Sequence, residues 1–477
     1  MTNWCTESYI WYSALDGGWE EIKKTMVKDI FGKLINPLTG AEGQPGDAFQ
    51  PASSEPAAVV LLISDLDGLN GREISSAIGQ ALTAWPRVEV RMAHKRLKPQ
   101  GDFTYVEKLA ESGRLGKIWL AEEKADVLIW GETLGTEGAA LVRFLAGAIN
   151  GDAKTGTFGL GDSLELPVRF GKEYHDIVGA AAVSASVAVK QPDDEPFAGV
   201  LASALGRVSG FVEAPPPGLS VTQNVSLLTC LGNCFTALWR TNGEDKHFER
   251  AVRVYKLALD SCPSGGMAVS QALIHNHMAA AFEGKAGTEP GTERLLAAAK
   301  SYQAVTETVG RIEYPQDWAF AQNRLGLVYY RLAVRSDNDA SYLLAAAKAF
   351  DAARVVLTQD DAPDQWGEIS NQLGVSLMAL SGQVAGTGTL ERSIAAFKDA
   401  HEVRLRTLAP LLWAQTSNNL GAASFSLFRR SSTPQLLEDA IRHFEGAREI
   451  YVQYRQERTV AVIEKNLKRA RELAARR

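Results

Sequence analysis

Four asparagines recur through the C-terminal half of the chain at intervals of 47 or 48 residues. They are Asn276, Asn323, Asn371 and Asn418. A side-chain amide both donates and accepts hydrogen bonds, so a row of amides could bind the main chain of an extended peptide without reading its side chains. The alternative is that each asparagine bonds a neighbouring helix or loop and fixes how the repeats stack. We favour the binding interpretation.

The asparagines belong to a repeat whose clearest copies read P-x-x-W-x-x-x-x-N-x-L-G. Its tryptophans are Trp318, Trp366 and Trp413, and its glycines are Gly326, Gly374 and Gly421. Weaker copies of the repeat extend the glycine position back to 279 and 232. An aromatic residue follows each of these five positions by 23 or 24 residues, at Tyr255, Tyr302, Phe350, Phe397 and Phe444. Two markers with one period predict a repeat array, in which these tryptophans, glycines and aromatics are packing residues.

Each repeat is predicted to be a helical hairpin. In one copy, apolar residues at helical spacing predict a first helix over about 316–333, and a second apolar stripe runs from Leu343 to Val356. The polar stretch 335–339 separates the two helices, and Pro363 stands at the approach to the next one, where proline is tolerated. One hairpin cannot cover such apolar faces alone, so neighbouring hairpins must stack.

These residues resemble the tetratricopeptide family. Leu325-Gly326 with Tyr329, followed by Phe350 with Ala353, has the order of that family's short code. The family repeat has 34 residues, so the repeat here is longer, as in kinesin light chains, whose Pro…Ala…Asn-Asn-Leu phrase is similar to the segment 410–420. The resemblance implies that the first helices line a concave groove for a peptide or protein partner.

A pair of acidic residues is the main alternative source of chemistry. Asp65 and Asp67 close an apolar run in the phrase Ile-Ser-Asp-Leu-Asp-Gly. The phrase resembles the first motif of haloacid dehalogenase-type phosphatases, which implies a nucleophilic carboxylate, a second acid/base carboxylate and Mg²⁺. The downstream acidic pair of that family has no clear match here, and Asp and Gly also favour ordinary turns. We therefore prefer a non-enzymatic function.

Other chemical motifs are weaker. Cys230 and Cys234 stand four apart, but we expect buried packing residues rather than metal ligands. His275 and His277 lie two apart and so face different sides of a helix. The segment 131–138 has glycines without the Gly-Lys-Ser/Thr of a phosphate loop. We expect no metal and no cofactor.

Residues 58–170 alternate strand and helix patterns, which predicts a small α/β sheet domain. The expected strands are 58–64, 88–92, 127–130 and 139–148, and the expected helices are 73–85 and 105–124. The order, with the phrase at 125–131, resembles the TolB amino-terminal-like domain, which occurs beside tetratricopeptide arrays in bacterial signalling proteins. That resemblance implies a non-catalytic sensory or docking module.

The remaining segments complete a multidomain protein of the α/β plus all-α class. We expect residues 1–35 to form an amphipathic helical segment. Its stretch 19–34 could bind a membrane surface or dock on a partner, although we prefer that it folds back on the protein. A linker follows at 36–57, before the sheet domain. After that domain we expect two connecting helices at 171–212 and a proline-rich hinge at 213–219. The solenoid then occupies 220–477, with five repeats and a capping helix.

Composition narrows the range of partners. The net charge of −6 gives no bulk reason to expect nucleic acid. The chain has no run of 18 apolar residues and no signal-peptide core at its N-terminus, so we expect a cytoplasmic protein. The expected function is that of an interaction scaffold or signalling adaptor, and the oligomeric state stays open.

Overall fold

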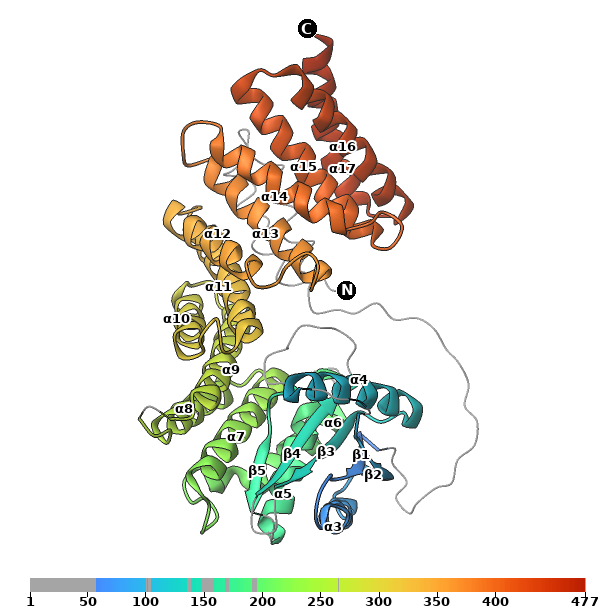
Figure 1. Cartoon of the computed structure of the whole chain (residues 1–477), viewed down its shortest axis with the longest axis vertical. Coiled ribbons are helices and arrows are strands. Elements are labelled where there is room, and N and C mark those ends of the chain that lie inside the picture. The colour runs from blue at the N-terminus through green and yellow to red at the C-terminus, as the bar shows by residue number, and fades with distance from the viewer. Residues whose placement is uncertain are drawn as a thin grey trace. The chain divides into compact units, whose positions relative to one another are not determined.

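A computed structural model of the chain describes residues 57–99, 101, 104–134, 139–147, 158–167, 171–190, 195–264 and 266–476 (Figure 1). These residues form two compact units. The first ends at Gly284 and holds the sheet and the first helices of the array, and the second begins at Lys285 and holds the remaining helices. The amphipathic segment 1–35 and the linker up to residue 56 lie outside the described residues.

The first unit contains a five-stranded sheet in the order β2-β1-β3-β4-β5. Its strands are β1 (Val59–Asp65), β2 (Val88–Arg96), β3 (Val127–Thr133), β4 (Ala139–Ala146) and β5 (Leu164–Pro167). The first three are parallel, and β4 and β5 are antiparallel additions. The predicted α/β domain is therefore confirmed. Strand β5 was not predicted, because four residues are too few to show an alternating pattern.

Helices cover both faces of the sheet (Figure 1). Helices α3 (Gly71–Thr83) and α5 (Lys172–Ala185) pack on each other and on one face, and α4 (Tyr105–Glu123) packs on the other. Both faces of the sheet are apolar enough to be covered, because consecutive residues of a strand point their side chains to opposite faces. Leu62 lies in the same apolar cluster as Leu120 of α4, whereas Ile63 lies near Gly79 of α3. Helix α4 begins with a capping box between Thr104 and Glu107.

Short helical segments lead from the sheet into the array. They are α6 (Glu195–Val208) and the 3-10 turns η2 (Ser186–Ala188) and η3 (Ser209–Val212). The array begins within the first unit with α7 (Val221–Asn242), α8 (Asp245–Asp260) and α9 (Ala268–Ala286). Helix α7 packs on both α8 and β5. The main chain of Glu165 in β5 is tied to α7, since its N–H donates to Ser226 Oγ at 2.9 Å.

The second unit continues the array as successive helices that pack in pairs, which confirms the predicted solenoid of helical hairpins. They are α10 (Glu293–Thr308), α11 (Pro315–Arg335), α12 (Ala340–Arg354), α13 (Pro363–Ser381), α14 (Gly388–Val403), α15 (Pro410–Ser431), α16 (Pro434–Gln453) and α17 (Glu457–Ala475). Proline begins α11, α13 and α15. It fits there because the first turn of a helix has no use for the missing N–H.

Candidate protein-interaction site

The two markers of the repeat contact each other. A Cβ added to Gly326 would lie 2.7 Å from the ring of Phe350, and one added to Gly374 would lie 2.6 Å from the ring of Phe397. Gly421 repeats the arrangement, at 2.8 Å from its own aromatic partner, Phe444. The rings are fully buried, so glycine is needed for the two helices of a hairpin to approach this closely. The contact fixes the rotation of the first helix and hence the side to which its asparagine projects.

The repeat tryptophans pack at the junctions between hairpins. Trp366 is buried, and Trp318 and Trp413 are half-buried against the apolar cores of their repeats. An arginine guanidinium lies over each ring, 4.8 Å from the centroid of Trp366 for Arg354 and 5.1 Å from that of Trp413 for Arg406. Each of these two rings thus lies against a cation as well as against apolar residues.

The asparagine row lies on successive first helices, α9, α11, α13 and α15, but its members differ in burial. Asn371 and Asn418 are buried, whereas Asn276 and Asn323 are half-buried. Asn371 Oδ1 accepts a hydrogen bond from Asn419 Nδ2 on α15 at 3.1 Å. At this position the amide therefore does help to stack one repeat on the next, as the alternative interpretation holds.

The same amides also keep atoms without partners. Asn323 Oδ1, Asn371 Nδ2 and Asn418 Oδ1 are each buried and have no hydrogen-bond partner within the described part of the chain. These three residues occupy one position in three consecutive repeats. A buried polar atom without a partner costs roughly 1–3 kcal/mol. The row thus presents an acceptor, a donor and an acceptor on the first helices of three consecutive repeats. Asn371 is 0% and Asn418 is 4% exposed, so a ligand would reach these two amides only if the helices moved apart.

A buried arginine organises the surroundings of Asn371. Arg404 is 5% exposed, and its guanidinium donates to Thr416 Oγ1 at 2.8 Å, to Gln415 Oε1 and to the carboxylate of Glu368. Thr416 in turn lies 3.5 Å from Asn371 Oδ1. This network was not predicted, since Arg404 lies between two helices and outside both repeat markers.

The acidic pair sits at the carboxyl end of β1 without forming an open acidic site. The main chain of Asp67 bridges to Glu132 at the end of β3, and its carboxylate lies 3.4 Å from Arg96 and 3.6 Å from Lys98. Asp65 is 8% exposed, and its Oδ1 has no hydrogen-bond partner among the described residues. Two cations therefore neutralise the carboxylate that the phosphatase interpretation assigns to acid/base chemistry.

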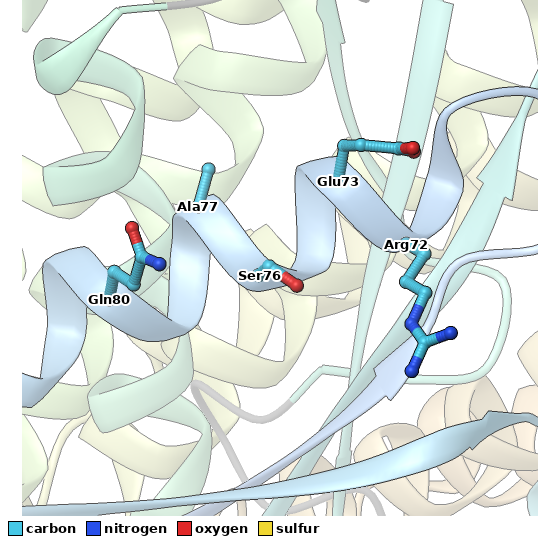
Figure 2. Close-up of a pocket in the computed structure, with 5 residues that line it drawn as sticks. All are labelled: Arg72, Glu73, Ser76, Ala77 and Gln80. Atoms are coloured by element: carbon cyan, nitrogen blue, oxygen red, sulfur yellow. The ribbon is translucent and has the colours of Figure 1, made fainter.

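A surface depression lies beside this pair on α3. It is lined by Arg72, Glu73, Ser76, Ala77 and Gln80, and Figure 2 shows that all five side chains project from this one helix. Arg72 Nε lies 3.9 Å from Asp65 Oδ2. A row of residues on a single helix, with no convergent groups from other elements, gives the depression no specific chemistry.

A buried polar network in the first unit was also missed. His277 Nε2 lies 2.8 Å from Asp162 Oδ1 and 3.4 Å from Asn233 Nδ2, and Tyr255 donates to Asn233 Oδ1 at 2.7 Å. The network ties the loop before β5 to α7, α8 and α9. Neither His277 nor Asp162 belongs to a regular pattern, so only the folded chain brings them together.

The described residues hold no group of three or more His, Cys, Asp or Glu side chains that could bind a metal ion. Cys230 and Cys234 are buried free thiols, and a hydrogen bond between them, with burial, raises the pKa of the Cys230 thiol. No helix in the described ranges is long and apolar enough to cross a membrane.

Comparison with known proteins does not assign the chain to a family. No protein-family model matches it, and no curated protein matches it.

Proposed function

We propose that this protein is an interaction scaffold or signalling adaptor that binds an extended segment of a protein or peptide along the first helices of its tetratricopeptide-like repeats. The sheet domain would serve as a sensory or docking module. The observation that supports the proposal is the amide oxygen of Asn323, which belongs to a half-buried residue and has no hydrogen-bond partner in the described part of the chain. Asn371 and Asn418 repeat this position on the next two first helices but are buried.

The chemistry of these atoms suits a peptide main chain. A peptide presents alternating N–H donors and C=O acceptors, so a carbonyl could accept from Asn371 Nδ2 while N–H groups donate to the oxygens of Asn323 and Asn418. Asn371 is already held by its bond to Asn419, so little side-chain freedom would be lost on binding. Recognition of this kind is insensitive to the ligand's side chains, and the specificity would come from neighbouring groups.

A displayed library of random peptides, selected on the immobilised full-length protein, tests the proposal. We expect selected peptides whose affinity falls about two- to tenfold on Asn323→Ala or Asn418→Ala, since each substitution removes one hydrogen bond worth roughly 0.5–1.5 kcal/mol. The matched control is Asn466→Ala, which removes an amide from α17, outside the row. Failure to select any peptide, or equal losses for all three variants, would refute the proposal.

A further inference from the structure

Two histidines from different hairpins meet beside a tryptophan near the end of the array. His401 of α14 and His443 of α16 have ring centroids 5.8 Å apart in an edge-on arrangement. The His401 ring also lies 5.2 Å from that of Trp413 on α15, and its Nε2 is 2.9 Å from Ser417 Oγ on the same helix. The two imidazoles thus lie at a junction of three helices.

The cations around this junction are largely paired with carboxylates. Lys398 on α14 and Arg442 on α16 both oppose a proton on His443, and Asp439, which favours that proton, is already paired with Arg442. Arg406 lies over the Trp413 ring, 5.1 Å from its centroid, and its guanidinium pairs with Glu449 of α16 at 2.6 Å. A proton added to either imidazole therefore meets an environment that does not compensate it.

Both imidazoles are half-buried, and burial is the main cause of their altered titration. It lowers the pKa of His443 to about 4, with smaller contributions from His401 and Arg442. Burial also lowers the pKa of His401. A histidine whose folded-state pKa is depressed is neutral in the fold and takes up a proton on unfolding. The stability that it supports is present above about pH 6.5 and is lost as the pH falls towards 4.

We propose that His401 and His443 form an acid-sensitive joint: neutral rings hold α16 and α17 on the array, and protonation releases them. Release would uncover the apolar residues that α16 and α17 bury, including Phe444, Ile463 and Leu467. The joint would then determine at which pH the last hairpin is closed. This inference concerns the array itself and does not depend on the proposed function.

Hydrogen exchange of the full-length protein, followed by mass spectrometry at pH 7 and pH 5, tests the joint. Protection factors are corrected for intrinsic exchange, so that they report opening equilibria. We expect the protection of residues 434–475 to fall about twentyfold between the two pH values, which is the ratio that a shift of one histidine pKa from 6.5 to about 4 gives. Protection of α12 should change much less.

His443→Asn keeps a polar side chain that does not titrate, and most of the pH-dependent loss should vanish in this variant. The matched control is His247→Asn on α8, which should leave the loss in residues 434–475 unchanged. An equal loss in α12 of the unmodified protein, or a full loss in His443→Asn, would overturn the proposal. The titration of His443 by nuclear magnetic resonance gives a test that needs no variant, because an apparent pKa near 6.5 would also overturn it.

Discussion

Replacement of Gly374 by alanine gives the sharpest test of how the hairpins are held together. The added Cβ would lie 2.6 Å from two ring atoms of Phe397, far inside normal contact distance. Phe397 is fully buried and so cannot move aside without displacing its neighbours. Overpacking of this kind costs about 1–3 kcal/mol, partly offset by the gain of up to about 1 kcal/mol when alanine replaces glycine in a helix.

We therefore expect Gly374→Ala to lower the free energy of unfolding by about 1–2 kcal/mol, which corresponds to a drop of roughly 2–8 °C in the melting midpoint. Circular dichroism and urea titration measure it. The matched control is Gly388→Ala in the partner helix α14, where an added Cβ meets no atom within 4 Å. This variant should be neutral or slightly stabilised, because it gains helix propensity without a clash.

A second-site change separates the clash from other effects. Phe397→Leu creates space at the same contact, so the double variant Gly374→Ala, Phe397→Leu should be more stable than the two separate losses predict. Equal responses of Gly374→Ala and Gly388→Ala, or strict additivity in the double variant, would refute the argument that the glycine–aromatic contact sets the hairpin geometry.

Three further outcomes follow from the fold and its polar networks. Truncation after Arg430 removes α16 and α17. It should cause aggregation or loss of a cooperative melt, because the apolar face of α15 loses its cover. A truncated chain that melts like the full one would contradict the interpretation as a stacked repeat array. Purified protein with Mg²⁺ should not hydrolyse an aryl phosphate, and hydrolysis that disappears on Asp65→Asn would establish the phosphatase alternative. Asp162→Asn should weaken the contact with His277 and reduce hydrogen-exchange protection in α9 by roughly 1–3 kcal/mol, whereas unchanged protection would show that the buried pair contributes little.

The regular parts of the fold could be predicted because each had a periodic pattern. The helices of the array follow apolar stripes and the marker glycines, and the strands of the sheet domain follow short apolar runs. In both cases one local rule, repeated along the chain, determines the structure. The same rule predicted that the marker residues are packing residues, and the contacts of Gly374 with Phe397 give the physical reason.

Contacts outside the period could not be predicted. Arg335 donates to the carbonyl oxygen of Ala286 at 2.6 Å, and Arg430, two repeats later, donates to that of Ser381 at 2.5 Å. Each arginine thus binds the end of an earlier first helix, where carbonyls lack helical partners. The intervening repeat has Gly382 at this position, so the arrangement is not periodic. Asn371 likewise forms its hydrogen bond with Asn419, which does not belong to the row, so the spacing of the row could not predict this partner.

The contact between Asn371 and Asn419 also allows the most direct test of the central claim, that the asparagine row binds a ligand. Asn371→Ala and Asn419→Ala each remove the same hydrogen bond between α13 and α15, but only Asn371 belongs to the row. Affinity for a library-selected peptide and the melting midpoint without peptide are measured for both variants. Our account predicts a smaller loss of stability for Asn371→Ala, which also removes the partnerless Nδ2, than for Asn419→Ala, which takes a donor from the buried Asn371 Oδ1. It predicts an affinity loss of about two- to tenfold for Asn371→Ala alone. Equal affinities in the two variants would contradict the claim and would leave stacking as the role of the row.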